Sequence, residues 1–471
     1  MIAFFDWPNR DTMSIQLHDT LRGKKVRFEP LKEGVVTMYL CGPTVYNYAH
    51  IGNARPAVVF DLLARVLRRH YTLTFARNIT DVDDKINAAS IETGKPIDEI
   101  TAKYIKAYND DMGALGVQPP DVEPRATQHI DVMIEMIEAL IEKGFAYVTE
   151  EHVLFDVSSY TPYGELSKRD LREMIAGSRV EVAPYKRAAH DFVLWKPSTP
   201  ELPGWESPWG RGRPGWHIEC SAMAEKHLGA TIDIHAGGQD LVFPHHENEC
   251  AQSNCAHDGA PFARYWLHNG FLSLDQTKMS KSLGNVLLVH DLIKSIPGEV
   301  IRLALLSAHY RQPLDWSAET IESARRMLDR LYGAVRGIEV SDESRAAAVV
   351  PEALVAALED DLNTPKALAE LFAIARALNK AHDERDKQTL AAELYAAGEI
   401  MGLLGNDPEQ WFAGHVEGDL PADEIEALIE QRNAAKAERD FERADAIRDQ
   451  LKDAGVSIQD GREGTTWRRR G

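Results

Sequence analysis

The chain is poor in cysteine and has no long hydrophobic run. It contains four cysteines in 471 residues, too few for a framework of disulfide bonds in a chain of this length. No stretch of about 18 or more apolar residues occurs, so we expect no membrane-spanning helix. The first residues, Met1 to Pro8, lack the basic start and apolar core of a secretory signal. A reducing cytoplasm is the expected setting.

Two common nucleotide-binding motifs are also absent. There is no Gly-x-x-x-x-Gly-Lys-Ser/Thr sequence, and no Gly-x-Gly-x-x-Gly follows the first expected strand, which argues against Walker-type and dinucleotide sites. A formal net charge of −20 argues against indiscriminate binding of nucleic acid. The chain nevertheless ends in the basic and aromatic sequence Trp467 to Arg470. This tail is equally compatible with a disordered end and with a surface that binds RNA.

The hydrophobic pattern predicts an α/β fold in the N-terminal part. Residues 34–42 have the pattern of a buried strand, 54–70 that of a helix with one apolar face, and 71–78 that of the next strand. A strand, helix and strand at this spacing form a βαβ unit of a parallel sheet. The segment 42–53 would then lie at the carboxyl end of the first strand, where open α/β sheets bind ligands.

The rest of the chain changes character twice. Residues 96–145 are mostly helical in pattern, 146–215 combine short strands with many prolines and several tryptophans, and regular α/β texture then returns. After about residue 298 amphipathic helices dominate, and a helical hairpin is predicted at roughly 422–453. A chain of this length is expected to form about two to four domains.

Two short segments have the chemistry of a nucleotide site. His50-Ile51-Gly52-Asn53 stands at the start of the first expected helix, whose free N–H groups and dipole attract phosphate. There His50 can donate to a phosphate, and Gly52 allows close approach of the backbone. Much later, Lys278-Met279-Ser280-Lys281-Ser282 supplies two cations, Lys278 and Lys281, for the charge that gathers on a leaving pyrophosphate.

Together the two segments resemble the split ATP site of class I aminoacyl-tRNA synthetases. That signature usually ends in a second histidine, where this chain has Asn53. Asparagine donates an amide hydrogen bond but carries no charge. We therefore expect Asn53 to act as a neutral donor to phosphate.

Candidate metal ligands are scattered along the chain. Cys41 ends the first expected strand, Cys220 lies near the start of a helix, and His245 and Glu249 share a face if their segment is helical. Two thiolates, an imidazole and a carboxylate would suit a tetrahedral zinc ion. The residues alone leave several combinations open, because a second histidine and a second glutamate lie between the last two.

Longer segments resemble the cysteinyl-tRNA synthetase family, in the family's order and over nearly the whole chain. They are residues 39–46, 78–85, 215–223, 233–241, 243–249 and 464–469. The resemblance implies one zinc ion per chain, held by Cys41, Cys220, His245 and Glu249. It implies that the walls of the cysteine pocket include Thr44 and Trp216. It further implies an adenosine-binding segment that contains His235, Gly237, Gly238 and Asp240.

The same resemblance implies a Rossmann-like parallel-sheet catalytic domain with an inserted subdomain, followed by a C-terminal α-helical bundle and a small anticodon-side domain. Its expected parts are 1–145 with 216–297 (catalytic), 146–215 (insertion), 298–404 (helical bundle facing tRNA) and 405–471 (linker, anticodon-binding hairpin and basic tail). In the last part, Trp467 would stack on bases, and Arg468 and Arg469 would contact phosphates.

The implied reaction activates L-cysteine with ATP, accompanied by Mg²⁺, and transfers it to the terminal adenosine of tRNA(Cys). Ligation of the substrate thiolate by zinc would select cysteine over serine. A monomer without membrane attachment is expected. Two alternatives stay open at this point. One is a ligase that transfers cysteine to a small-molecule amine, as in mycothiol synthesis. The other is a non-catalytic zinc- and RNA-binding relative, which Asn53 invites.

Overall fold

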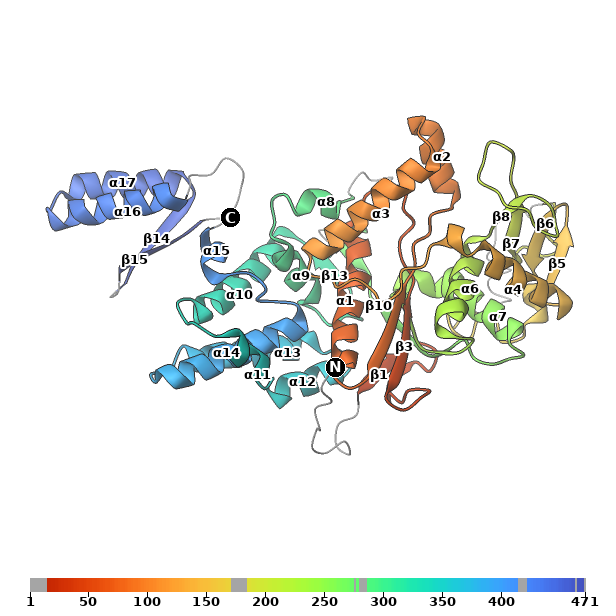
Figure 1. The fold of residues 1–471 in the computed structure, drawn as a ribbon, viewed down its shortest axis with the longest axis horizontal. Helices are drawn as coiled ribbons and strands as arrows, with labels where there is room; N and C mark the ends of the chain where they lie inside the picture. The colour runs from red at the N-terminus through yellow and green to blue at the C-terminus, as the bar shows by residue number, and fades with distance from the viewer. Residues whose placement is uncertain are drawn as a thin grey trace. The chain divides into compact units, whose positions relative to one another are not determined.

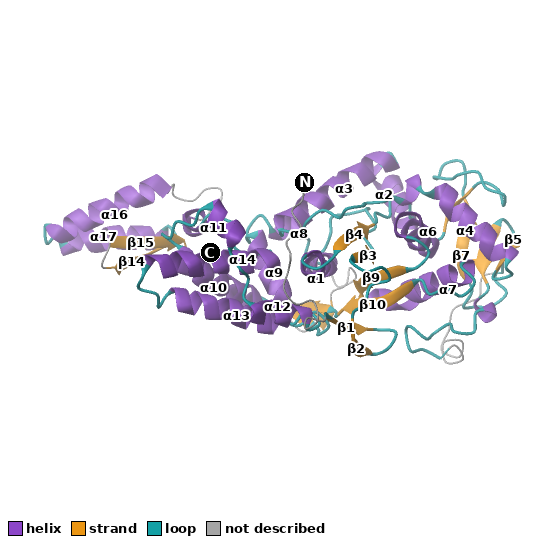
Figure 2. Cartoon of the chain, turned by 60° about the horizontal axis from the view of Figure 1, so that its bottom comes forward, coloured by secondary structure: helices purple, strands orange, loops and turns teal. Residues whose placement is uncertain are grey.

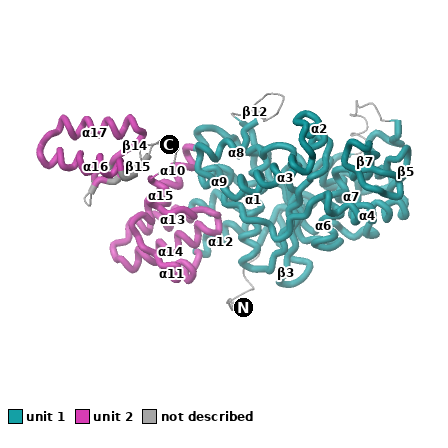
Figure 3. Tube along the Cα trace, turned by 45° about the horizontal axis from the view of Figure 1, so that its top comes forward, with its two compact units in different colours: residues 1–321, 351–369 teal, residues 322–350, 370–471 magenta. Residues whose placement is uncertain are grey.

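A computed structural model describes residues 15–170, 184–274, 277–278, 286–413, 422–461 and 464–469. The chain divides into two compact units, coloured separately in Figure 3. The first contains residues 1–321 and 351–369, and the second contains 322–350 and 370–471. None of the helices in the described ranges has the length and apolar character that a bilayer crossing requires.

A four-stranded parallel sheet forms the centre of the first unit. Its strand order is β10-β9-β3-β4, with strands at Ala263–Asn269, Ile232–Gly238, Val35–Leu40 and Thr72–Arg77. Helix α1 (Ile51–Arg68) packs on one face and α6 (Trp216–Leu228) on the other (Figure 2). Because parallel strands end at the same edge, the segments after β3 and β9 lie together. The predicted α/β fold with a parallel sheet is confirmed.

Register places the ends of the two central strands side by side. Leu40 of β3 lies opposite Ala236 of β9, and the backbone N–H of Cys41 donates to the Ala236 carbonyl at 3.2 Å. All seven residues of β9 are buried, as expected for a strand covered on both faces. The chain leaves this sheet edge after Leu40 of β3 and after Gly238 of β9, so the side chains near these ends are available for a site.

The first unit has further elements around this sheet. The hairpin β1–β2 (Gln16–Asp19, Lys24–Arg27) precedes it. The antiparallel sheet β5-β6-β7-β8 (Ala146–Thr149, His152–Phe155, Phe192–Pro197, Gly212–Pro214) comes from the segment predicted to hold short strands. The helices are α2 (Asp84–Thr93), α3 (Ile97–Ala114), α4 (Ile130–Glu142), α7 (Glu247–Ala256), α8 (Val289–Leu292), α9 (Gly298–Leu306) and α12 (Glu352–Glu359).

A small sheet contains the start of the predicted loop at residues 278–282, which we call the lysine-rich loop. Strand β11 (Leu272–Leu274) pairs with β12 (Thr277–Lys278) in antiparallel fashion and with β13 (Leu314–Trp316) in parallel. The backbone of Lys278 thus lies in a strand, opposite Ser273. The remaining residues of the loop, including Lys281, lie outside the described ranges.

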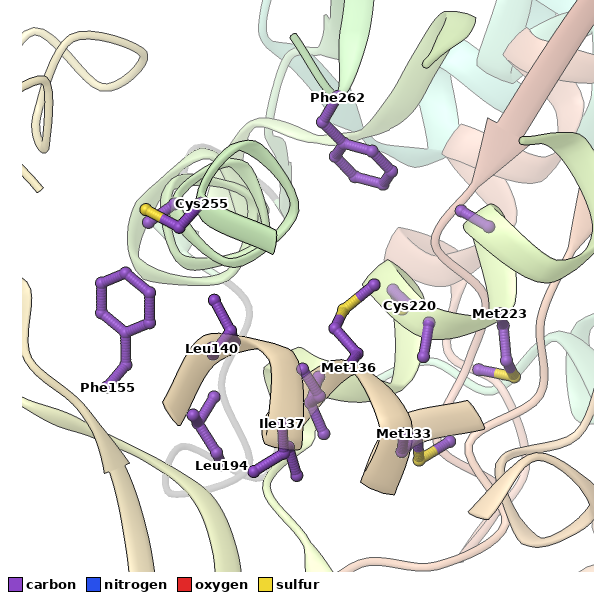
Figure 4. Close-up of a cluster of buried hydrophobic side chains, with 14 of the residues drawn as sticks. Met133, Met136, Ile137, Leu140, Phe155, Leu194, Cys220, Met223, Cys255 and Phe262 are labelled. Atoms are coloured by element: carbon purple, nitrogen blue, oxygen red, sulfur yellow. The ribbon is translucent and has the colours of Figure 1, made fainter. Parts of the chain in front are cut away.

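A hydrophobic cluster sets the position of α6 and α7. Figure 4 shows side chains of α4, among them Met133, Met136 and Leu140, together with Cys220 of α6 and Cys255 of α7. All five are buried. Removing this apolar surface from water holds the three helices together, and it places the first turns of α6 and α7 at the edge of the central sheet.

The second unit is helical and ends in a β-hairpin. Helices α10 (Ala318–Val335), α11 (Asp342–Ala347), α13 (Thr364–Leu378), α14 (Glu384–Met401), α15 (Pro408–Ala413), α16 (Ala422–Ala437) and α17 (Phe441–Asp453) lie wholly or partly in it. The predicted helical hairpin at 422–453 is confirmed. The strands β14 (Val456–Gly461) and β15 (Gly464–Arg469) follow, at the blue end of the ribbon in Figure 1.

The β-hairpin corrects the alternative of a disordered tail. Trp467 stands opposite Ile458 in the strand pair, and both pack against the apolar cluster formed by Ile425, Leu428 and other residues of α16 and α17. The indole therefore contributes to the core of this terminal element. The side chains of Arg468 and Arg469 lie outside what the structure describes.

A buried carboxylate ties the β1 strand to the turn between α12 and α13. Asp361 is 1% exposed. It accepts the backbone N–H of His18 at 2.9 Å and the Tyr310 hydroxyl at 2.7 Å, and it pairs with Arg311 at 2.7 Å. Its neighbour Asp360 pairs with Lys25 at the surface.

Asp361→Ala should lower the free energy of unfolding by about 3 kcal/mol, because it leaves buried donors without their acceptor. Urea unfolding followed by tryptophan fluorescence measures this loss. Asp360→Ala is the matched control and should cost about 0–1 kcal/mol, as exposed ion pairs do. Equal losses in the two variants would show that the buried carboxylate has no special role.

Candidate metal centre and nucleotide loops

Four predicted ligands meet at the edge of the central sheet. We call Cys41, Cys220, His245 and Glu249 the quartet; one ligand atom of each lies within 4.8 Å of every other. The two sulfur atoms are 3.7 Å apart, and Cys41 Sγ is 3.4 Å from Glu249 Oε1. His245 Nε2 is 2.6 Å from the same oxygen. The structure therefore brings together residues that are up to about two hundred positions apart in the sequence.

The members of the quartet come from β3, α6 and the start of α7. Cys41 follows β3, Cys220 is in the second turn of α6, and Glu249 is in the first turn of α7. His245 precedes α7 in a helical turn, so its side chain reaches the carboxylate four residues later, as predicted. The residues Cys220, His245 and Glu249 are 1%, 1% and 0% exposed.

Charge stabilises the ionised forms of the carboxylate and the imidazole. Burial would raise the pKa of Glu249, but His245 and His235 hold it well below its usual range. Burial would lower the pKa of His245, but the Glu249 carboxylate and a hydrogen bond with Cys220 raise it to about 10. Burial raises the pKa of the Cys41 thiol. A divalent cation would compensate the buried negative charge of Glu249 and would favour the thiolate forms of Cys41 and Cys220.

The quartet fits zinc in ligand type and spacing. Two sulfurs, one imidazole nitrogen and one carboxylate oxygen are donors that zinc accepts in a tetrahedral arrangement. Zinc–sulfur bonds of about 2.3 Å would hold two thiolates about 3.8 Å apart, close to the 3.7 Å between Cys41 and Cys220. The chain thus contains a buried cluster of Cys, His and Glu side chains that could bind a metal ion.

Two further histidines adjoin the cluster. His235 Nε2 is 2.7 Å from Glu249 Oε2 and 3.5 Å from Cys41 Sγ. Cys41 and Glu249 also form a second possible group of metal ligands with His235 and His246. The family resemblance placed His235 in the adenosine-binding segment. Its fully buried imidazole instead contacts the quartet, which favours a role in orienting Glu249 over direct contact with a nucleotide.

Histidine 217 was missed by sequence reasoning. Its Nδ1 is 2.9 Å from Nδ1 of His245, on the side of that ring away from Glu249. Burial and the neighbouring His245 lower the pKa of His217 to about 3. A neutral His217 can accept the remaining N–H of His245 and so fix which nitrogen faces the cluster. Its position three residues before Cys220 was the available signal.

One of the two residues expected to line the cysteine pocket contacts the quartet. Trp216 is 40% exposed, and its ring stacks on that of His245 at 4.2 Å between centroids. A core aromatic would be buried, so the exposure supports a wall of an open pocket. The other residue, Thr44, comes three residues after Cys41 and forms an isolated β-bridge with Thr80.

The glycine pair at the end of β9, Gly237 and Gly238, permits close packing. A Cβ atom on Gly237 would lie 2.7 Å from the His246 ring, so a side chain there would displace the imidazole. At Gly238 a Cβ would meet the Asp240 carboxylate at 2.4 Å. Asp240 itself is exposed just beyond the strand. Its carboxylate is thus available to a ligand, which is what the adenosine-binding prediction requires.

The predicted phosphate-binding residues His50 and Asn53 also cap the N-terminus of α1. Helix α1 begins at Ile51 with His50 as the N-cap residue, and the backbone N–H of His50 donates to Asn53 Oδ1 at 3.2 Å. The Asn53 side chain therefore organises the first turn through its oxygen. Its amide nitrogen remains the donor predicted for phosphate.

The described flank of the lysine-rich loop joins this turn. The backbone N–H of Ile51 donates to Leu287 at 2.9 Å, and that of Val289 donates to Ala49 at 2.9 Å. His50 and Leu288 form the bridge between them. The segment that follows the loop is thus a neighbour of this turn, whereas the side chains of Lys278 and Lys281 lie outside the description.

Family models match the chain in three consecutive parts. The catalytic domain of class I (C) tRNA synthetases matches residues 27–326, a DALR domain matches 353–405, and a cysteinyl-tRNA ligase anticodon binding domain matches 417–468.

Relatives match over almost the full length. The chain is 59% identical to a cysteine–tRNA ligase of Parvibaculum lavamentivorans, covering 98% of both chains. It is 59% identical to one of Xanthomonas campestris, covering 97% of this chain and 99% of the relative.

Solved structures share the fold at low identity. A LeuRS of Agrobacterium radiobacter in a ternary complex with tRNA and LeuAMS gives a TM-score of 0.59 at 12% identity, over 82% of this chain and 86% of that one. The methionyl-tRNA synthetase of Mycobacterium tuberculosis with methionyl-adenylate gives 0.53 at 17% identity, over 78% and 89%.

Cys220→Ser should remove most bound zinc from the purified protein, because a serine hydroxyl is a far weaker ligand than a thiolate. Metal analysis per protein chain measures the loss. Cys255→Ser is the matched control, since Cys255 is buried in the same hydrophobic cluster but is not a member of the quartet. Full zinc content in the Cys220→Ser protein would exclude the quartet.

Proposed function

The chain belongs to the cysteine–tRNA ligase family of class I tRNA synthetases, and on this basis we propose that it activates L-cysteine with ATP and transfers it to tRNA(Cys). The observation that carries the proposal is that a quartet able to hold a metal ion and the N-terminus of α1 lie at one sheet edge. Cys41 belongs to the quartet, and the chain from Cys41 to His50 leads into α1.

In the first step the cysteine carboxylate attacks the α-phosphorus of ATP, and the bond to pyrophosphate breaks. The positive end of the α1 dipole faces the phosphates. His50 and Asn53 supply further donors, and Gly52 lets the backbone come close. Lys278 and Lys281 supply positive charge as the leaving pyrophosphate becomes more negative. Mg²⁺ accompanies the ATP.

Recognition of cysteine takes place beside this phosphate site. Zinc bound to the quartet would offer a ligand position to the substrate thiolate, for which serine has no equivalent of similar strength. Trp216 packs against His245 and encloses the pocket. His235 and His217 orient Glu249 and His245 from behind. Asp240 and the glycine pair would hold the adenosine at the end of β9.

In the second step a terminal ribose hydroxyl of the tRNA takes the cysteinyl group and releases AMP. The helical region 298–404 is proposed to face the tRNA, and 405–471 to bind its anticodon end. Trp467 packs in the terminal apolar cluster, so its main part in this element is to hold the β-hairpin on α16 and α17. Arg468 and Arg469 are proposed to contact phosphates.

The division into a catalytic domain (1–145 and 216–297), an insertion (146–215) and the two C-terminal parts is retained as part of the proposal. The protein is proposed to act as a monomer in the cytoplasm.

The purified protein should charge tRNA(Cys) with cysteine when ATP is present. Charging with serine should be weaker by a factor on the order of 10⁴ in kcat/KM, because the site is built around the thiol. Acid-precipitable radiolabelled amino acid on the tRNA measures both reactions. A tRNA with a changed anticodon is the control for the C-terminal contacts.

The charging assay also separates the rival acceptor. Both a tRNA ligase and an amine ligase exchange pyrophosphate into ATP when cysteine is present. Cysteine-dependent exchange without any charging of tRNA would therefore contradict the proposal and favour a small-molecule amine as acceptor.

A further inference from the structure

A buried arginine, Arg55, joins helix α1 to the small sheet that contains β11, β12 and β13. Arg55 lies in α1, one turn after His50, and is 0% exposed. Its guanidinium donates to three backbone carbonyls: Gly270 at 2.8 Å, Phe271 at 2.6 Å and Gln312 at 2.6 Å. Among the described residues no carboxylate pairs with it. Burial lowers the pKa of Arg55 to about 10, so the side chain is still charged at neutral pH.

A buried cation without a carboxylate is costly, and the hydrogen bonds that it makes must compensate. An apolar residue of similar volume would fill the same space at lower cost. The planar fork of arginine, however, can hold several carbonyls in fixed relative positions. The geometry of Arg55 is thus suited to fixing backbone segments against α1.

The three carbonyls belong to the two segments that enter the small sheet. Gly270 and Phe271 connect β10 to β11, and Gln312 comes shortly before β13. The segments are also joined to each other, because Gly270 N–H donates to Tyr310 at 2.8 Å and Leu314 N–H donates to Phe271 at 3.0 Å. The junction is tight: a Cβ on Gly270 would lie 2.6 Å from the Gln312 oxygen.

This junction determines where the backbone of Lys278 lies. Strand β11 starts directly after Phe271 and pairs with β12, in which Lys278 stands opposite Ser273. On the other side of the loop, Leu287 and Val289 are hydrogen-bonded to the first turn of α1. Both described flanks of the loop are therefore attached to α1, one through its backbone and the other through Arg55.

We propose that Arg55 is a positioning residue for adenylate formation, which holds the strands leading to Lys278 in register with the helix turn that carries His50. The inference rests on the proposed function, since it assumes that both loops act on one ATP. Arg55 itself touches no substrate. A displacement of about 1 Å between groups that must act together can lower a rate on the order of 100-fold.

The test compares Arg55→Lys with Arg302→Lys in the full chain. Arg302 is also 0% exposed and also contacts α1, but it does so through Asp61 at 2.6 Å, and it reaches Leu115 after α3. Cysteine-dependent exchange of pyrophosphate into ATP is measured for both, with active sites counted by the burst of adenylate formation. Counting active sites removes losses that come from misfolded protein.

Arg55→Lys should lower kcat/KM for ATP by about 10- to 100-fold per active site, while KM for cysteine and metal content stay at wild-type values. Arg302→Lys should lower the melting temperature and keep kcat/KM for ATP near that of the wild type. Similar kinetics of the two variants, or a rise in KM for cysteine that matches the rise in KM for ATP in Arg55→Lys, would overturn the proposal.

Gly270→Ala provides a second variant if Arg55→Lys does not fold. It keeps Arg55 but presses on the Gln312 carbonyl, so it should produce the same defect confined to ATP. A normal KM and kcat for ATP in Gly270→Ala would then overturn the proposal. Absence of cysteine-dependent exchange in the wild-type protein would instead overturn the proposed function, so the two failures are distinguishable.

Discussion

The burial of the Glu249 carboxylate is the constraint around which the site is built. The side chain has no exposure, and its oxygens lie within 2.7 Å of the His235 and His245 imidazoles. A buried carboxylate is tolerated only when charge and hydrogen bonds compensate its lost hydration. The imidazole of His245, with the thiols of Cys41 and Cys220, offers donors of the kind that zinc accepts. The sheet edge, α6 and α7 have to meet for this compensation to exist.

Helix α1 gives the site a common frame. Its N-terminus follows Cys41 of the quartet by about ten residues, and its first turn is hydrogen-bonded to the segment after the lysine-rich loop. Arg55, one turn later, holds the strands before that loop. The groups proposed to recognise the amino acid and to act on the phosphates are therefore both connected to α1. Such an arrangement keeps catalytic groups at the spacing that their joint action requires.

The sequence predicted the parallel sheet and the helical hairpin, because their periodicity is local. The sequence alone did not decide among the metal ligands. The alternatives His246 and Glu247 differ from His245 and Glu249 only in the face of the turn that they occupy. The resemblance chose the quartet whose atoms the structure brings within reach. The resemblance assigned His235 to the nucleotide site. Its contact with Glu249 joins two segments that are separate in the sequence, so the sequence could not reveal it. Arg55 looked like any polar helix residue, and its three carbonyl partners come from long-range packing. The terminal β-hairpin was missed because short strands after a helix carry a weak pattern.

The central claim is that a metal in the quartet binds the substrate through its sulfur. Protein prepared with Co²⁺ in place of zinc allows a direct measurement, because a new cobalt–thiolate bond adds charge-transfer absorption in the near ultraviolet. We predict that cysteine increases this absorption with saturation, while serine and S-methylcysteine leave the spectrum unchanged. An unchanged spectrum with cysteine, under conditions in which the same protein forms cysteinyl-adenylate, would contradict the account.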